Sequence, residues 1–321
     1  MRRNAIFIGL ICLIFSVVLM VCTDQRTDFP EKKITLICPW SAGGGTDTIL
    51  RGLVKQTETF LGQNITVINK TGGGGAIGHG AGTTARPDGY TVTMVTFEII
   101  SLPPQGLVPF TYKDYSLLMR VNMDPAAITV PADAPYNTLA EFVAYAKKHP
   151  GAIKVGHSGP ASVWEISGSI FAEKAGIDLT FVPHDGAAPA VTALVGKHIQ
   201  AVSVSPAEVL GQVEAGNLKM LAIMNDERLD DFPTVPTMKE SGYDVSIGTW
   251  RGLAVPKKTP EDIQVVLHDA FKKGMDSAKF RTFAANSGLG LAYLNGEDWA
   301  KELSVSSVEV ANIMKKLGLA K

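Results

Sequence analysis

The sequence contains few cysteines, with only Cys12, Cys22 and Cys38 among its 321 residues. Cys12 and Cys22 lie in or at the end of an apolar N-terminal stretch, so the remaining chain keeps one cysteine and no partner for a disulfide. The sequence also lacks an excess of charge of either sign, because its formal net charge at pH 7 is −1. Neither nucleic acid nor an anionic membrane surface is therefore indicated as a partner.

Several catalytic and nucleotide-binding motifs are absent or incomplete. No Gly-Lys-Ser/Thr follows a glycine-rich loop, which excludes a Walker A site, and without HExxH we expect no metal. GHSGP (156–160) resembles the G-x-S-x-G nucleophile elbow of hydrolases, but Pro160 stands where the last glycine is required. We therefore expect Ser158 to be a hydrogen-bond donor rather than a nucleophile. GGGAIG (73–78) satisfies G-x-G-x-x-G, but the short, glycine-rich helix after it argues against a dinucleotide. We expect no cofactor.

The N-terminus has the pattern of an export signal. Arg2 and Arg3 precede an uninterrupted apolar stretch over residues 5–21. This stretch ends in LMVC, which resembles the lipobox of bacterial lipoproteins, where Cys22 would become the lipidated first residue. Val21 stands where a small residue is usual, so an uncleaved anchor or a simple signal remain alternatives. We expect residues 1–22 to be a signal segment, and an exported protein in the periplasm or on the outer face of the cytoplasmic membrane.

Alternating strands and helices predict an α/β protein with parallel sheets. Helices are expected at 47–60, 76–85, 138–148, 162–175, 188–196, 260–273 and 296–316, and strands at 33–38, 64–68, 90–95, 126–130, 152–155, 179–182, 199–203, 219–223 and 250–255. The pattern restarts near residue 152, which predicts two α/β halves. Strands near residues 128 and 252 would cross between lobe 1 (30–127 plus 251–321) and lobe 2 (128–250). Open α/β sheets bind ligands at strand ends, so we expect a cleft between the lobes.

The segment PWSAGGGTD (39–47) is the strongest candidate for a binding loop. Its glycines let the backbone approach a ligand, and the helix that follows directs free N–H groups and a positive dipole end at the same place. We expect Ser41, Ala42, Gly43 and Gly44 to contact an anion here. Asp47 is a further candidate, although Asp47 or Thr46 could instead only cap the helix.

Two charged residues could reach the same cleft. Asp185 precedes a predicted helix in the segment HDGAAPA, where it would favour a ligand hydroxyl, amine or water if it faces the cleft, or else cap the helix or lie in a surface turn. Arg251 lies where a crossing strand begins. It could form a forked contact with a ligand carboxylate, or an interlobe salt bridge with equal plausibility.

Together, ordered segments resemble one family of proteins: ITLICPWSAGGGTD, NKTGGGGAIG, RPDGYTV, FVPHDGAAPAVTALVGKHIQAV, VEAGNLKMLAIM, FPTVPTMKESGYDV and TWRGLAVP. They are similar to the extracytoplasmic solute receptors of tripartite tricarboxylate transporters, the TctC or Bug family, from about residue 30 to the C-terminus. The resemblance implies a two-lobed fold like that of type II periplasmic binding proteins. It also implies a receptor, not an enzyme, that closes over a small di- or tricarboxylate and delivers it to a membrane permease of one large and one small subunit.

The resemblance also assigns site residues. One ligand carboxylate would be held by two glycine loops, which places Gly74, Gly75 and Ala76 beside the first loop. The variable end of the ligand would meet the second lobe at Ser158, Ser162, Asp185, Gly186 and Ala187. Thr71 and Glu165 depart from the common pattern, and Glu165 near the cleft would disfavour a fully ionised tricarboxylate. An exported hydrolase-like enzyme and a ligand-sensing adaptor are the alternative functions.

Overall fold

The computed structural model describes residues 29–321. The expected signal segment, Cys22 and most of the polar tether lie outside the described residues. Within residues 29–321, no helix is both long and apolar enough to cross a membrane.

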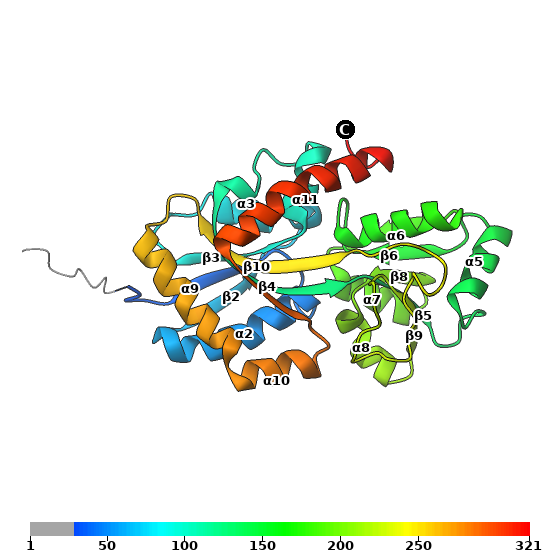
Figure 1. Ribbon diagram of the computed structural model, residues 1–321, viewed down its shortest axis with the longest axis horizontal. Coiled ribbons are helices and arrows are strands. Elements are labelled where there is room, and N and C mark those ends of the chain that lie inside the picture. Colours follow the sequence, from blue (N-terminus) through cyan, green and yellow to red (C-terminus); the bar gives the residue numbers. More distant parts are fainter. Residues whose placement is uncertain (1–28) are drawn as a thin grey trace, which may run out of the picture.

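The first lobe is a mixed six-stranded sheet with the strand order β11-β4-β10-β3-β1-β2 (Figure 1). Its strands are β1 (Ile34–Cys38), β2 (Ile65–Asn69), β3 (Thr91–Thr96), β4 (Tyr115–Pro125), β10 (Gly248–Pro256) and β11 (Leu291–Asn295). Its helices are α2 (Gly45–Leu61), α3 (Ala76–Thr83), α4 (Glu98–Ser101), α9 (Glu261–Asp276), α10 (Ala278–Asn286) and α11 (Gly296–Lys316). Strand β1 is parallel to β2 and β3, whereas β10 is antiparallel to β3 and β4.

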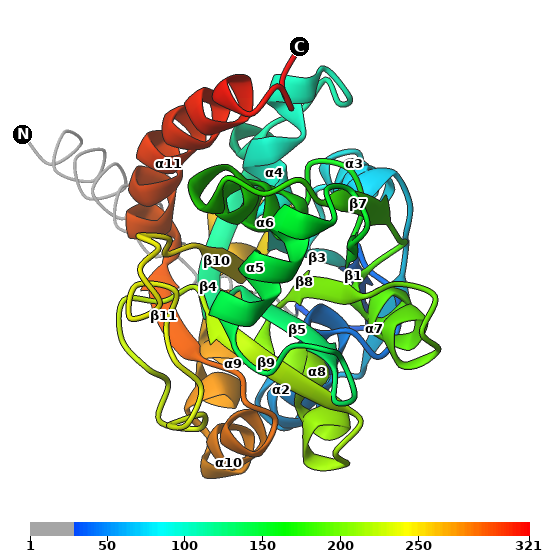
Figure 2. The ribbon, with the colours of Figure 1, turned by 90° about the vertical axis from the view of Figure 1, so that its right-hand side faces the viewer.

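The second lobe is a five-stranded sheet with the order β7-β6-β8-β5-β9, surrounded by helices (Figure 2). Its strands are β5 (Ala127–Pro131), β6 (Lys154–His157), β7 (Thr180–Pro183), β8 (Ala201–Val204) and β9 (Leu218–Ile223). Its helices are α5 (Leu139–Lys148), α6 (Val163–Ala175), α7 (Ala187–Val195) and α8 (Pro206–Glu214). Strand β6 runs parallel to β7 and β8, while β5 is antiparallel to β8 and β9.

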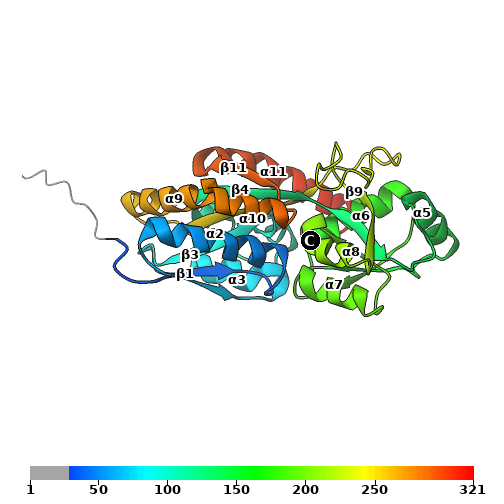
Figure 3. The same cartoon turned by 90° about the horizontal axis from the view of Figure 1, so that it is seen from below.

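Two passages of the chain join the lobes, seen from below in Figure 3. Strand β4 ends beside Ala126, and β5 begins in the other sheet immediately after it. The Ala126 amide donates to the carbonyl oxygen of Ile247 at 2.9 Å, just before β10 enters the first sheet, and the Met224 amide donates to the carbonyl oxygen of Ala126. Backbone hydrogen bonds therefore tie the passages together where a hinge between the lobes would bend.

The structure confirms the α/β class and the two-lobed arrangement with crossing strands, and it shows where the sequence-based expectations differ. Strands β4 and β11 and helices α4, α8 and α10 were not predicted. Strand β10 already belongs to the first sheet at Gly248, before the predicted limit at residue 250. Helix α2 begins at Gly45 with Gly44 as its N-cap residue, so neither Thr46 nor Asp47 caps it.

Candidate functional site

A small cavity lies between the lobes, where the carboxyl ends of several strands meet helix N-termini. Its volume is about 20 Å³, enough for about one water molecule. Its wall consists of Trp40, Ser41, Gly44, Gly45, Thr46, Glu98, Ser158, Val163, Trp164, Ala187, Glu208, Thr249 and Arg251. Because both lobes contribute to this wall around so little space, the structure is a closed form.

The loop after β1 supplies backbone and hydroxyl donors to the cavity. Gly45 is the first residue of α2, and the first amides of a helix have no partner within the helix. The buried Ser41 Oγ has no hydrogen-bond partner among residues 29–321. A Cβ on Gly45 would lie 2.9 Å from Arg251 Nη2 and 3.1 Å from Glu208 Cγ, so a larger residue there would require these side chains to move. The loop therefore directs donors at the cavity and permits a close approach to the opposite lobe.

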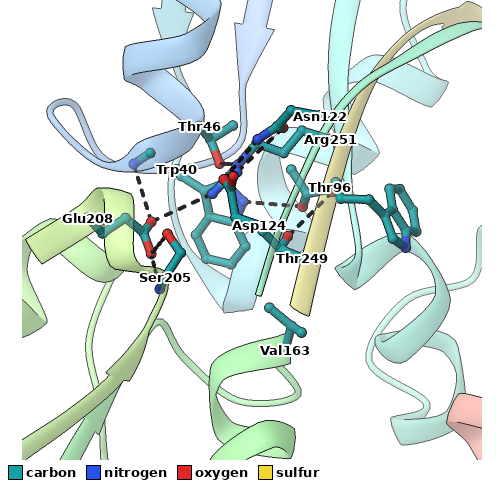
Figure 4. A network of polar contacts seen from close by, with 12 residues as sticks. Trp40, Thr46, Thr96, Asn122, Asp124, Val163, Ser205, Glu208, Thr249 and Arg251 are labelled. Carbon is teal, nitrogen blue, oxygen red and sulfur yellow. Dashed lines mark hydrogen bonds and ion pairs between the residues drawn. The ribbon is translucent and has the colours of Figure 1, made fainter. Parts of the chain in front are cut away.

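Arg251 is fixed in the cavity wall by contacts within the protein (Figure 4). Its Nε donates to Thr46 Oγ1 at 2.8 Å, and its Nη1 pairs with the buried carboxylate of Asp124. Its Nη2 lies 3.8 Å from Oε1 of Glu208, which belongs to the second lobe. The sequence left open a ligand contact or an interlobe salt bridge, and the structure shows the salt bridge.

Two buried glutamates complete the polar part of the wall. Glu208 Oε1 accepts from the Gly45 amide at 3.2 Å, and Oε2 accepts from the amide and hydroxyl of Ser205. Glu98 Oε1 accepts from the Val163 amide at 3.1 Å. Burial raises the pKa of both carboxyl groups, while the Arg251 charge and the donors oppose that shift.

The second lobe contributes the ends of β6, α6 and α7. Ser158 follows β6, and Val163 and Ala187 are the first residues of α6 and α7. Burial lowers the pKa of the neighbouring His157 to about 4, so its imidazole is neutral at pH 7. Helix N-termini from both lobes thus converge on one cavity, an arrangement that suits an anion.

Of the residues expected at the site, five line the cavity: Ser41, Gly44, Ser158, Ala187 and Arg251. Asp47 does not, because its carboxylate is engaged elsewhere. It accepts from the Gly43 amide at 3.1 Å, from Asn69 Nδ2 at 2.8 Å and from Arg51 Nε. Asp47 therefore stabilises the conformation of the loop without lining the cavity. Ala42 and Gly43 are exposed on the outer side of the same turn.

The second glycine loop, with Gly74, Gly75 and Ala76, lies beside the cavity rather than in its wall. A Cβ on Gly74 would meet the carbonyl oxygen of Pro160 in the other lobe at 2.5 Å, and one on Gly75 would meet the Trp40 ring at 3.2 Å. Both glycines have positive φ, 63° and 91°. This loop permits close contact between the lobes and packs against Trp40, which itself lines the cavity.

Three further expected residues also lie outside the wall. Ser162 is the N-cap of α6 and accepts from the Glu165 amide at 3.2 Å. Asp185 is exposed. Gly186 is the N-cap of α7, where a Cβ would lie 2.4 Å from Ser41 Oγ. Glu165 accepts from the Ala161 amide and supports the start of α6 without entering the cavity.

Trp40, Gly45 and Thr46 belong to the predicted first binding loop, whereas the other wall residues were missed as site residues: Glu98, Val163, Trp164, Glu208 and Thr249. Glu208 had a usable signal, since Ser205, Pro206 and Glu208 form the capping-box pattern at the start of α8. For Glu98, no sequence signal indicated a position in the cleft, because its partner Val163 is distant in the sequence. No group of three or more His, Cys, Asp or Glu side chains suited to a metal occurs in the described part of the chain.

Comparisons with known proteins agree with this architecture. A family model described as "Tripartite tricarboxylate transporter family receptor" matches residues 49–319. The "UPF0065 protein in gbd 5'region" of Cupriavidus necator is 33% identical over 303 residues, covering 94% of this chain and 92% of that protein.

Two solved structures are also similar. The periplasmic binding protein BugD is 28% identical with a TM-score of 0.88, over 91% of this chain and 100% of that one. MatC of Rhodopseudomonas palustris, solved with bound malate, is 27% identical with a TM-score of 0.78, over 90% of this chain and 98% of that one. The similarity spans both lobes.

Proposed function

Because the chain belongs to the tripartite tricarboxylate transporter family of receptors, we propose that it is an exported solute-binding receptor that closes its two lobes over a small organic acid. The observation that carries this proposal is the cavity between the lobes, toward which the first turns of α2, α6 and α7 point. Free helix-terminal amides favour an anion at such a place. The malate bound to the related MatC supports a carboxylate as that anion.

A carboxylate would be seated by Ser41 and by amides in the first turns of α2 and α7. The unpartnered Ser41 hydroxyl lies at the junction of both turns, because Gly186 packs against it from the other lobe. Micromolar affinity needs about 8 kcal/mol, and hydrogen bonds to a charged group contribute about 1.5–3 kcal/mol each. Four or five such bonds reach this value before the cost of closing the lobes. Arg251, already paired, is not required as a ligand contact.

We further propose that the receptor delivers its ligand to a membrane permease with a large and a small subunit, which the family description supports. The loaded, closed form would be recognised by that permease after hinge closure around Ala126. The periplasmic relative BugD supports a location outside the cytoplasm. Lipid attachment at Cys22 is proposed on the sequence pattern alone.

A thermal-shift screen of mono-, di- and tricarboxylates and amino acids tests the proposal. Binding to the folded state raises the free energy of unfolding by about 2.7 kcal/mol when the ligand is at 100 times its Kd. At least one carboxylate is expected to raise the melting temperature in a concentration-dependent manner. The Ser41→Ala variant is expected to bind that acid about 10- to 100-fold more weakly, since one charged hydrogen bond is lost.

Ser304→Ala, a change of a surface serine on α11, is the matched control and should bind like the wild type. A screen in which no acid shifts the melting temperature would contradict the proposed function. Equal affinity of the wild type and Ser41→Ala would instead contradict the proposed seat of the carboxylate.

A further inference from the structure

One buried glutamate from each lobe accepts a hydrogen bond from the first turn of a helix in the opposite lobe. Glu98 in the first lobe accepts from the amide of Val163, the first residue of α6 in the second lobe. Glu208 in the second lobe, which is labelled in Figure 4, accepts from the amide of Gly45, the first residue of α2 in the first lobe. The protein's own carboxylates thus occupy one helix N-terminus on each side of the cavity.

Both glutamates are bound as acceptors through both oxygens. The second oxygen of Glu98 accepts from the Thr96 hydroxyl, and the second oxygen of Glu208 accepts from the Ser205 amide and hydroxyl. Only an ionised carboxylate accepts through both oxygens without also having a proton to donate. These contacts stabilise the ionised form of both carboxylates and so oppose the rise in pKa that burial causes.

The single cation in the wall offsets these charges only in part. Among the described residues that line the cavity, Arg251 is the only one with a positive charge, and its Nη1 is paired with the buried Asp124. Three carboxylates, those of Glu98, Asp124 and Glu208, thus accompany one guanidinium. The family resemblance alone would allow two or three ligand carboxylates, but a second one enclosed here would face like charges with little water between them.

We infer, resting on the proposed function, that this cleft takes an acid with a single carboxylate whose other polar end donates hydrogen bonds, and that Glu98 and Glu208 discriminate against a second carboxylate. The carboxylate would use the Ser41 hydroxyl and the unoccupied amides of α2 and α7. A hydroxyl, amide or ammonium group at the other end would face the two glutamates. These residues determine specificity and take no part in any chemical step.

Calorimetric titration at neutral pH with size-matched pairs tests this inference. Succinate, glutarate and adipate are each compared with their half-amides, in which one carboxylate is replaced by a neutral amide of similar shape. For at least one chain length, the wild type should bind the half-amide at least about tenfold more tightly than the diacid. The Glu98→Gln and Glu208→Gln variants retain an acceptor oxygen and should shift this ratio toward the diacid.

Glu165→Gln is the matched control, because Glu165 is a carboxylate at the start of α6 that does not line the cavity. Its ratio should equal that of the wild type, and circular dichroism should show that all three variants are folded. The inference is overturned if the wild type binds a diacid as tightly as its half-amide at every chain length that binds, or if neither glutamine variant changes the ratio. Binding of diacids alone would overturn the inference and support the proposed function, whereas no binding in this series and the earlier screen would overturn both.

Discussion

Gly45 is the position at which a single added methyl group most directly tests lobe closure. A Cβ there would lie 2.9 Å from Arg251 Nη2, 3.1 Å from Glu208 Cγ and 3.2 Å from Glu208 Oε1. Arg251 has little freedom to move, because its other nitrogens are bound to Asp124 and Thr46. In Gly45→Ala, we therefore expect Glu208 to move away from the α2 N-terminus.

The cost follows from the contact that is lost. Withdrawal of Glu208 breaks its hydrogen bond to the Gly45 amide, and a hydrogen bond to a charged group contributes about 1.5–3 kcal/mol. Because Glu208 belongs to the opposite lobe, the cost applies to the closed conformation and not to an open one. A ligand that requires closure should therefore bind about 10- to 100-fold more weakly. The secondary structure should remain, since alanine is a better helix former than glycine.

Calorimetry with the acid found in the thermal-shift screen measures this loss. Gly211→Ala, in α8, is the matched control, because a Cβ there meets no atom within 4 Å. Gly211→Ala should bind like the wild type. The reasoning is refuted if Gly45→Ala is folded and binds the acid with unchanged affinity, because the close approach of the lobes at Gly45 would then not be needed.

Three further changes have expected outcomes. Arg251→Met leaves the buried Asp124 without its cation and should lower the free energy of unfolding by about 3–5 kcal/mol, measured by urea titration. Burial raises the pKa of Asp47, but hydrogen bonds from Arg51 and other donors outweigh it and leave the pKa below its usual 3.8. Asp47→Ala should therefore be less stable than the wild type above pH 3.8, and the difference should shrink as the pH falls through the lowered pKa. Burial raises the pKa of Glu98 above its usual 4.5, so the stability of the wild type relative to Glu98→Gln should fall as the pH rises above 4.5, and a constant difference would contradict this.

The first binding loop could be predicted because its signals are local. A strand-forming segment, three glycines and an amphipathic helix occur in succession, and the structure places Ser41, Gly44 and Gly45 at the cavity. The start of α2 was placed slightly late, because Asp47 resembles a cap but is bound to Arg51 and Asn69. A side chain suited to capping identifies a helix start only when no stronger partner is near.

The parts that were missed depend on contacts between distant segments. Strand β4 is a central strand paired on both sides, so it lacks the regular alternation that marks a half-exposed strand. Helix α8 had a capping-box signal at Ser205 and Glu208, but nothing local shows that Glu208 also reaches Gly45 in the other lobe. The role of Glu98 likewise depends on closure of the lobes. Sequence patterns locate loops, whereas closure decides which of their side chains share a cavity.

A crystal structure of the protein with its tightest-binding acid tests the central claim most directly. We expect the ligand carboxylate between the lobes, within hydrogen-bond distance of Ser41 Oγ and of first-turn amides of α2 and α7. An acid bound outside this cavity, or held by Arg251 with Ser41 still unpartnered, would contradict the account.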